Sequence, residues 1–523
     1  MNPKTETAPD QGSQKDARDG DEDARTAGIP VFNPATGDVV ETVPTDGPTD
    51  VAATVARVRS NQAEWEALGI KGRHTKLDLL RDWVLDNSER ITDSMQLETG
   101  KVRAEAANEG FYVADQINFY GRKAGRWIGE ERVRPHSLIT ASRKLRIQYR
   151  PYPVVGLISP WNFPLVLSLG DAIPALMAGA VVVMKPSEFT PLTLGMIVDA
   201  WHDEIGGPDV MACVNGAAET ATALIDESDF IGFTGSDRTG KLVMARAAET
   251  LTPVSLELGG KDPMIVLDGA DLDRAAEAAA WGGMMNSGQI CMSVERVYVE
   301  APVYDEFIGK LTEKVEGLRQ GADGTEFGSE VGAMTSPAQI GIVEDQVEDA
   351  IASGAKALTG GSRLEGDGDY FRPTVLVDVD HSMRVMKDET FGPVVGVMKV
   401  GDTEEAIRLA NETRYGLSAT VFGRTGQAEK VARRIECGGV NVNDVLFNAL
   451  TPGVPMGGWK ESGIGWRNGL HGIRKYCRSE AIVTARFPWL PEPFWFPYTP
   501  ERRGLINRLT RFVTGRGRRR IKG

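Results

Sequence analysis

From Val154 onward, short apolar runs alternate with segments in which apolar residues recur every three or four positions. The runs predict buried strands, and the segments between them predict helices. This alternation is typical of βαβ units, so we expect an α/β fold with two doubly wound domains that meet near Leu258. The predicted strands span 154–158, 181–184, 210–214, 229–233, 263–267, 296–300, 374–377, 394–398 and 419–422, and helices 272–280, 303–318 and 338–354 lie in the second block.

The segment before this alternation is helical in pattern. Three consecutive helices are predicted over residues 49–129, and the second carries its buried stripe at Leu79, Leu80, Trp83 and Val84. We therefore expect a helical layer in front of the first parallel sheet.

The two ends of the chain differ from the rest. Residues 1–28 contain almost no large apolar side chain and predict a disordered arm. Residues 501–523 hold nine Lys or Arg and one Glu, and their apolar residues fall at helical spacing, which predicts a basic amphipathic helix after an aromatic, Pro-rich lead-in. Such a helix suits an anionic membrane surface, or it packs on the acidic protein or on a neighbouring subunit. Its apolar stripe is Leu505, Ile506, Leu509, Phe512 and Val513.

Composition and charge exclude several classes of protein. The chain has 523 residues, which is enough for two or three domains, and 73 Asp or Glu against 59 Lys or Arg give a net charge of −14. That charge argues against a general nucleic-acid binder. The four cysteines form no C-x-x-C pair, so we expect a cytoplasmic protein without a disulfide scaffold or a metal cluster. No apolar run is long enough to predict a membrane span.

Two motifs in the first block are candidates for phosphate and ribose contacts. FTGSDRTG follows a predicted strand and opens a helix, so Gly235 and Ser236 can bind a phosphate, although a plain helix N-cap explains the same residues. KPSE lies at the end of another strand, where Glu188 can accept ribose hydroxyls with Lys185 beside it. The alternative for this second pair is a solvated ion pair.

Three residues are candidates for catalysis. Cys291 follows Gly288 and Gln289, which suits a nucleophile that needs close backbone approach, although a lone cysteine is more often a small buried hydrophobe. Glu257 stands among apolar residues and is a candidate general base; its alternative is an ion pair with Lys261. Asn162, held between two prolines, is a candidate oxyanion donor or an Asx-turn residue. No histidine lies in these motifs, so a Cys–His or Ser–His–Asp site has no candidate partner.

The motifs taken together resemble the NAD(P)-dependent aldehyde dehydrogenase superfamily over about residues 29–490. The strings that carry the resemblance are PWNFP, KPSE, FTGS, LELGGKDP, GQIC, ETFGPV and PMGGWKESGIG. The resemblance implies catalysis by Cys291, Glu257 and Asn162. It also implies cofactor contacts at Pro160, Trp161, Lys185, Ser187, Glu188, Phe233, Gly235, Ser236, Leu258, Glu389 and Phe391.

The resemblance further implies a division of the chain. It places a Rossmann-like NAD-binding domain at 29–139 and 152–258, a catalytic domain at 259–450, and a small β oligomerisation arm at 140–151 and 473–495. The implied partners are an aldehyde and further copies of the chain in a homodimer or homotetramer.

The implied reaction oxidises an aldehyde through a thioester on Cys291, with NAD preferred because Glu188 repels a 2′-phosphate and with NADP as the alternative. An apolar substrate is expected because apolar residues flank the catalytic motifs and the loop 445–455 has no Ser to anchor a carboxylate. The flanking residues are Phe163, Leu167, Met285, Ile290, Met292, Leu446, Phe447 and Leu450. Succinic semialdehyde is the alternative substrate, with Arg126 as its candidate cation. A thioesterase and a non-catalytic binding protein on the same fold are the alternative functions.

Overall fold

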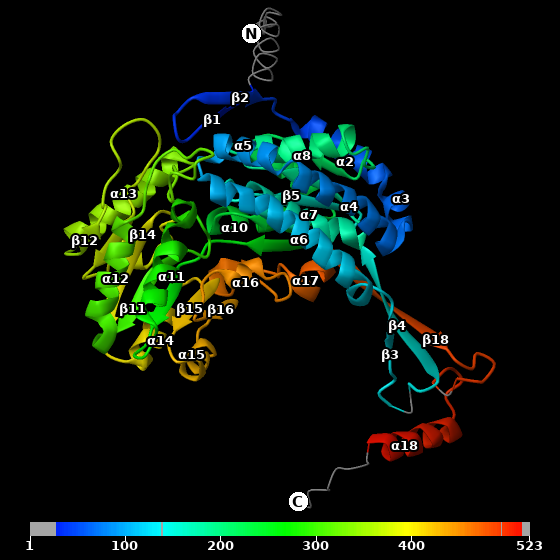
Figure 1. Ribbon diagram of the computed structural model, residues 1–523. Helices are drawn as coiled ribbons and strands as arrows, with labels where there is room; N and C mark the ends of the chain where they lie inside the picture. The colour runs from blue at the N-terminus through cyan, green and yellow to red at the C-terminus, as the bar shows by residue number, and fades with distance from the viewer. Residues whose placement is uncertain (1–27, 138–139, 493, 515–523) are drawn as a thin grey trace, which may run out of the picture.

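The computed structural model describes residues 28–137, 140–492 and 494–514. The predicted N-terminal arm therefore lies outside the described residues apart from Gly28, and so does the basic tail beyond Thr514. Figure 1 shows two large α/β layers side by side and a narrow arm that leaves one of them. The predicted fold class, two mainly parallel sheets covered by helices, is the one observed.

The first sheet has the strand order β17-β9-β8-β5-β6-β7, and all of its strands are parallel except β17. The apolar runs of the sequence form its strands because both faces are covered and every residue of β5, β6 and β8 is buried. Its strands are β5 (Val154–Ile158), β6 (Val181–Lys185), β7 (Met211–Cys213), β8 (Phe230–Thr234), β9 (Val254–Glu257) and β17 (Gly463–Ile464). The helices between them are α7 (Pro164–Ala178), α8 (Leu192–Asp203), α9 (Ala218–Glu227) and α10 (Asp237–Ala248).

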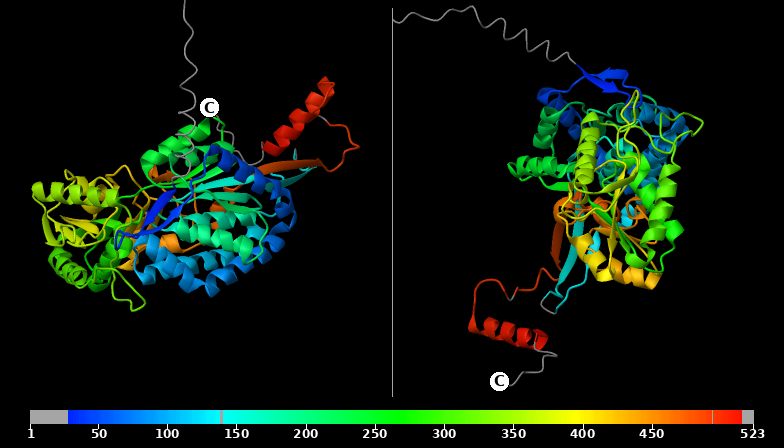
Figure 2. Two further views of the ribbon diagram at one scale, coloured as in Figure 1. Left: turned by 90° about the horizontal axis from the view of Figure 1, so that it is seen from above. Right: turned by 90° about the vertical axis from the view of Figure 1, so that its left-hand side faces the viewer.

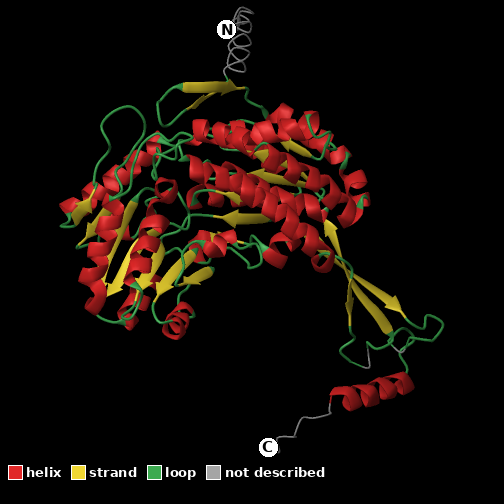
Figure 3. Cartoon of the chain, in the orientation of Figure 1, coloured by secondary structure: helices red, strands yellow, loops and turns green. Residues whose placement is uncertain are grey.

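The second sheet has the order β12-β13-β14-β11-β10-β15-β16, with β12 alone antiparallel. Alternate residues of β10 enter different cores, Ile265 on one face and Met264 and Val266 on the other. Its strands are β10 (Asp262–Val266), β11 (Val294–Glu300), β12 (Lys356–Thr359), β13 (Thr374–Val377), β14 (Val394–Val400), β15 (Ser418–Phe422) and β16 (Gly439–Val442). Its helices are α11 (Leu272–Met284), α12 (Tyr304–Glu316), α13 (Pro337–Ala352), α14 (Thr403–Asn411), α15 (Thr425–Ala432) and α16 (Phe447–Leu450). Figure 3 shows helices on both sides of the strands.

The helical layer before the first sheet has five helices, so the prediction of three is wrong. The bounds are α2 (Pro48–Ser60), α3 (Gln62–Ala67), α4 (Gly69–Asp86), α5 (Ser88–Thr99) and α6 (Arg103–Trp127). Gly69 and Gly100 take positive φ values of 65° and 71°, which break the helical path where periodicity alone shows no boundary. Leu79 is 45% exposed, so it is not part of the buried stripe; Leu77, Leu80 and Val84 are.

The arm is a three-stranded antiparallel sheet in the order β18-β4-β3. It combines β3 (Glu131–Val133), β4 (Arg143–Pro151) and β18 (Cys477–Ala485), and β3 pairs with β4 although the sequence division put it in the first domain. The short helix α17 (Gly469–Arg474) precedes β18, and Ile473 and Tyr476 belong to the core of the first sheet rather than to the arm. The hairpin of β1 (Ile29–Phe32) and β2 (Val39–Val43) was not predicted.

The predicted amphipathic tail helix is present as α18 (Pro500–Thr514). Figure 2 shows it beyond the arm sheet and apart from the helices that cover the two large sheets.

Candidate active site

The carboxyl ends of four parallel strands bring the sequence motifs to one edge of the first sheet. Ile158 of β5 is paired with Lys185 of β6 and with Phe233 of β8, and Thr234 of β8 is paired with Glu257 of β9. From β5 the chain runs outward through β6 and β7, whereas β8 and β9 lie on the other side of β5. The gap between β5 and β8 is therefore a topological switch point, where α/β sheets bind ligands.

Glu257 ends β9 and is 4% exposed. Neither of its carboxylate oxygens has a hydrogen-bond partner among the residues that the structure describes. Burial raises the pKa of Glu257 to about 7, and the positive charges of Arg467 and Lys475 oppose that shift. The alternative ion pair with Lys261 is wrong, because Lys261 pairs with Glu295 and donates to Thr390. An unpartnered buried carboxylate that titrates near neutral pH has the properties of a general base.

Cys291 follows a tight turn of unusual backbone. Asn286, Ser287 and Gly288 all have positive φ values, between 51° and 70°. A side chain at residue 288 would clash with the carbonyl of Gly392, so only glycine fits. A side chain at Gly260 would likewise clash with the carbonyl of Cys291, which places the LELGGK motif directly against the cysteine turn.

The acidity of Cys291 does not set it apart from the other cysteines. Burial raises the pKa of Cys291 to about 12, with the charges of Glu389 and Asp262 as further causes. The pKa values of Cys213, Cys437 and Cys477 are also raised by burial to about 12. What separates Cys291 is therefore its position in the glycine-lined turn beside Gly260.

Asn162 is fixed by contacts far along the chain. Its Nδ2 donates to the carbonyl of Gln289 at 2.8 Å, and its own carbonyl accepts from Asn286 Nδ2 at 3.0 Å and from Lys101 Nζ at 2.8 Å. The Asx-turn alternative fails because the side chain bonds a residue of the cysteine turn instead of its own neighbours. An amide nitrogen carries two hydrogens, so one remains for a substrate oxygen. The backbone N–H of Cys291 donates to no described residue and is available as a second donor.

Lys185 and Glu188 do not form the solvated ion pair that was the alternative. Lys185 is 4% exposed, and its ammonium donates to the carbonyls of Pro186 and Gly216 at 2.8 and 2.6 Å. Glu188 is half-buried, and Ser187 Oγ lies 3.4 Å from its carboxylate. The carboxylate thus keeps most of its hydrogen-bonding capacity.

Ser236 is the N-cap of α10, since its Oγ accepts from the backbone N–H of Thr239 at 3.2 Å. The N-cap explanation is therefore correct. The backbone N–H of Arg238 is also taken, because it donates to Asp237 Oδ1 at 2.8 Å, and the N–H of Asp237 is left without a partner among the described residues. A Cβ on Gly235 would lie 2.6 Å from the ring of Phe233, so the ring occupies the space that a side chain would need and only glycine fits.

The ETFGPV motif lies against the cysteine turn from the second sheet. Glu389 Oε1 accepts from the backbone N–H of Gly260 at 2.9 Å, and burial raises the pKa of Glu389 to about 8. The ring of Phe391 stacks edge to face on Trp161, with centroids 5.4 Å apart. Pro160 and Trp161, which follow β5, are half-buried, and Leu258, which follows β9, is buried. Residues from both large sheets thus surround one site.

A search against family models matches residues 21–482 to the aldehyde dehydrogenase family. This chain belongs to the aldehyde dehydrogenase family. The resemblance seen in the sequence is confirmed, and with it the reaction class, oxidation of an aldehyde to a carboxylic acid.

Three relatives illustrate the similarity of this family member to known proteins. A 4,4'-diapolycopene aldehyde oxidase from a Methylomonas species is 39% identical over 90% of this chain and 88% of its own. A protein from Mycobacterium ulcerans that carries the name of an NADP-dependent succinate-semialdehyde dehydrogenase is 38% identical over 90% and 91%. Betaine aldehyde dehydrogenase from Staphylococcus aureus, solved in complex with NAD+, has a TM-score of 0.83 at 31% identity and covers 90% and 93%.

Two buried ionic groups support the site of this aldehyde dehydrogenase and were not found from the sequence. Lys101 Nζ binds Glu109 at 2.6 Å as well as the carbonyl of Asn162, and Glu109 accepts from the backbone of Leu165 and Val166 at the start of α7. Lys101 lies in the short connection before α6 and Glu109 lies within α6, so in the sequence both look like solvent-facing charges of a polar segment.

The second group is centred on Asp171, which forms ion pairs with Arg467 and Lys475 and accepts from the Tyr476 hydroxyl. Asp171 is the one charge in the helix PLVLSLGDAIPALMA, and a lone charge in an apolar helix is a signal that could have identified it. The group lies close enough to Glu257 for its charges to act on that carboxylate.

The apolar residues predicted to line the substrate side divide into two sets. Ile290, Met292 and Leu446 are buried in one core cluster, and Phe163, Met285 and Cys291 pack against it. Leu167 is also buried, whereas Phe447 and Leu450 are 52% and 46% exposed. Arg126, the candidate cation for an anionic substrate, is exposed near the end of α6.

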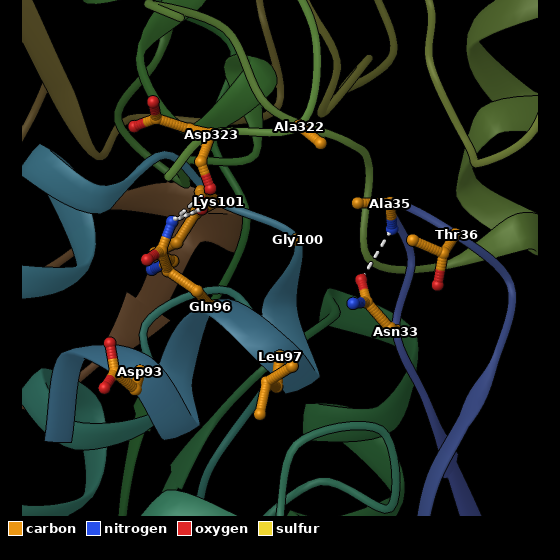
Figure 4. Close-up of a pocket in the computed structure, with 10 residues that line it drawn as sticks. All are labelled: Asn33, Ala35, Thr36, Asp93, Gln96, Leu97, Gly100, Lys101, Ala322 and Asp323. Carbon is orange, nitrogen blue, oxygen red and sulfur yellow. Dashed lines mark hydrogen bonds between the residues drawn. The ribbon is translucent and has the colours of Figure 1, made fainter. Parts of the chain in front are cut away.

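A cavity of about 310 Å³ lies outside this site, between the β1–β2 loop, the end of α5 and residues 322–323. Figure 4 shows Asn33, Gln96, Gly100 and Asp323 around it. None of the predicted catalytic or cofactor residues lines this cavity. In the described part of the chain, no group of His, Cys, Asp and Glu is arranged to hold a metal ion.

Proposed function

We propose that this chain uses Cys291, Asn162 and Glu257 to oxidise an apolar aldehyde to its acid, with a nicotinamide dinucleotide as the oxidant. The observation that carries the proposal is Glu257: a buried carboxylate without a partner, with a pKa of about 7, on the strand that leads into the glycines packed against Cys291. Burying an acid without partners is costly, so a functional role accounts for it better than packing does.

The residues act in two stages. In the first, Cys291 loses its proton to water, and Sγ forms a bond to the carbonyl carbon of the aldehyde, while Asn162 Nδ2 and the Cys291 N–H hold the oxygen that becomes negative. A bound nicotinamide supplies the acceptor for the hydride that then leaves this carbon. In the second, Glu257 takes a proton from water, the water oxygen adds to the thioester carbon, and the bond to Sγ breaks to release the acid.

The residues at the switch point fit a dinucleotide. Glu188 has spare acceptor capacity for ribose hydroxyls, and the N-terminus of α10 after Gly235 suits a pyrophosphate. Asp237 in the first turn of α10 would repel a phosphate, but its charge is compensated by an ion pair with Arg414. Trp161 and Phe391 form an apolar contact at this edge, and Gly392, next to Phe391, packs against Gly288 of the cysteine turn.

NAD is expected to be preferred over NADP. The carboxylate of Glu188 repels the 2′-phosphate of NADP, so kcat/KM with NAD is expected to be at least about tenfold higher. Glu188→Gln is expected to reduce that ratio, whereas Glu219→Gln, an exposed change on α9, is expected to leave it unchanged. Equal kcat/KM values for the two dinucleotides in the unaltered enzyme would contradict this prediction.

Aldehydes with an apolar chain are expected to be better substrates than succinic semialdehyde. Each buried CH₂ group contributes about 0.8 kcal/mol, so hexanal is expected to exceed succinic semialdehyde in kcat/KM by at least about tenfold. The measurement is reduction of NAD and of NADP over a panel of polar, aliphatic and aromatic aldehydes. A higher kcat/KM for succinic semialdehyde would make that compound the substrate class and Arg126 the residue to test, and no turnover of any aldehyde would overturn the proposed reaction.

We further propose that the enzyme is a cytoplasmic homo-oligomer that associates through its arm. The nine-residue strand β18 is an edge strand of the arm sheet, and an open edge of this length is suited to pairing with another copy. All four cysteines are free thiols, which suits a reducing compartment. No helix in the described ranges is long and apolar enough to cross a membrane.

A further inference from the structure

The segment that follows the arm presents large aromatic side chains to solvent. Trp489, Trp495, Phe496 and Tyr498 are each at least 70% exposed. Phe496 and Tyr498 contact one another with ring centroids 4.6 Å apart. Exposed aromatic side chains grouped in this way mark an interaction surface.

The helix α18 adds positive charge to this surface. Arg503, Arg508 and Arg511 are exposed, and none of them forms an ion pair with a residue that the structure describes. Leu505 is 50% exposed, so the helix also offers an apolar side chain. A helix with arginines and exposed apolar residues is typical of segments that lie in the headgroup region of a bilayer.

Arg502 joins the aromatic segment and the helix into one unit. Its guanidinium donates to the carbonyls of Trp495 and Pro497 at 3.1 Å each. The backbone N–H of Arg503 donates to the carbonyl of Thr499, so this end of α18 is held by the lead-in. We call residues 487–514 the tail surface.

The position of the tail surface argues against packing on the acidic part of the protein. Figures 1 and 2 show α18 beyond the arm sheet and apart from both large sheets. The chain as a whole carries a net charge of −14. Because α18 lies apart from both large sheets, their negative charge does not neutralise the arginines of the tail. Arginines without ion pairs attract anionic lipid headgroups, and exposed tryptophans favour the boundary between the headgroups and the acyl chains.

We propose that the tail surface docks the enzyme on membranes that contain anionic lipids. The docking is peripheral: arginines contact the headgroups, and the aromatic rings enter the boundary between headgroups and acyl chains. This inference stands on residues outside the active site and goes beyond the proposed function. If the substrate is apolar, as proposed above, docking also places the enzyme beside the phase in which such an aldehyde dissolves.

The test is co-sedimentation of the full chain with vesicles of phosphatidylcholine alone and with about 30% phosphatidylglycerol. We expect the full chain to pellet with the anionic vesicles only, and binding to fall at least about tenfold as the salt rises from about 50 to 500 mM. The triple variant Arg503→Glu, Arg508→Glu and Arg511→Glu is expected to lose at least about tenfold in binding. Trp489→Ala with Trp495→Ala is expected to lose about threefold or more.

A matched control carries the same change of charge on the body of the protein. Arg122→Glu, Lys123→Glu and Lys430→Glu alter exposed residues outside the tail surface, and we expect binding within about twofold of the unaltered chain. Turnover of a water-soluble aldehyde, measured in both triple variants, checks folding separately from lipid binding. Equal loss in the two triple variants, or pelleting that does not respond to salt, would overturn the proposal. A loss of oligomer mass in the tail variant without any lipid binding by the full chain would identify the tail as a subunit contact instead.

Discussion

Replacing Cys291 by serine is expected to lower kcat for a good aldehyde by roughly 10³-fold or more. The serine hydroxyl is nearly isosteric with the thiol but is a far weaker nucleophile and a poorer leaving group, so both stages of the reaction are affected. Dinucleotide binding is expected to be unchanged, because the residues proposed to hold it lie on the first sheet and the ETFGPV motif. The measurement is steady-state turnover together with a dinucleotide titration.

Cys213→Ser is the matched control for this substitution. Cys213 lies in β7, and burial raises the pKa of its thiol to about 12, as it does for Cys291. If the removal of any buried thiol lowered the activity, both variants would lose it. If the activity depends on the thiol in the cysteine turn, only Cys291→Ser loses it. Turnover by Cys291→Ser within tenfold of the unaltered enzyme would show that another group is the nucleophile.

Glu257→Gln is expected to separate the two stages. The first stage does not use the carboxylate as a base, so the variant should form about one equivalent of reduced dinucleotide per site and then stop, with steady-state turnover lower by roughly 10²–10⁴-fold. Rapid mixing of enzyme, dinucleotide and aldehyde measures both phases. If both the burst and the turnover disappear while folding is intact, Glu257 acts in the first stage.

Glu98→Gln controls for the loss of any buried carboxylate. Burial raises the pKa of Glu98 to about 7 as well, but Glu98 accepts from the backbone of Leu192 and Thr193 at the start of α8 and has neither Cys291 nor Asn162 as a hydrogen-bond partner. We expect this variant to be less stable but to keep the ratio of burst to steady-state rate.

The pKa values also predict that the rates of both stages rise with pH, but over different pH ranges. Glu257 works as a base only when ionised, and its pKa of about 7 means that steady-state turnover rises from pH 6 to about 8 and then levels, provided that hydrolysis limits the rate. The thiol of Cys291 has a pKa of about 12, so the burst rate should keep rising beyond pH 9. In Glu257→Gln the rise near pH 7 should be lost and the rise at high pH retained.

Nine strands of the two large sheets could be predicted because they are largely buried on both faces and so read as apolar runs. The strands β9, β12, β16 and β17 were not among them, and β12 and β16 are mostly not buried. The arm strand β4 could not be found in this way: RKLRIQYRP is largely polar and half-exposed, and the arm was expected only from the family resemblance. The helix boundaries at Gly69 and Gly100 depend on single left-handed residues, which periodicity does not detect. The local pattern therefore predicted the buried strands well, and it predicted exposed strands and helix boundaries poorly.

The candidate site shows the same division. Cys291, Glu257 and Asn162 were proposed from motifs, and the structure places the Asn162 amide against the cysteine turn and Gly260 against the Cys291 carbonyl. The charges that hold these groups were not predicted, since Lys101 and Glu109 reach Asn162 and Leu165 only when α6 packs against the start of α7. Such contacts form only when separate segments pack together, and the local pattern of a sequence does not show which segments do so.

The pairing of β9 with β17 has a consequence for how the protein is made. Glu257 at the end of β9 is paired with Gly463, so the outer neighbour of the strand that bears the proposed general base is synthesised roughly 200 residues later, about 10–40 s at the usual ribosomal rate. During that interval β9 is an open edge on an otherwise complete sheet, and an open edge is a template for wrong pairing. The nascent chain therefore has the most need of a chaperone while β10 to β16 are still being made, and the active site cannot be finished before the ribosome has passed residue 463.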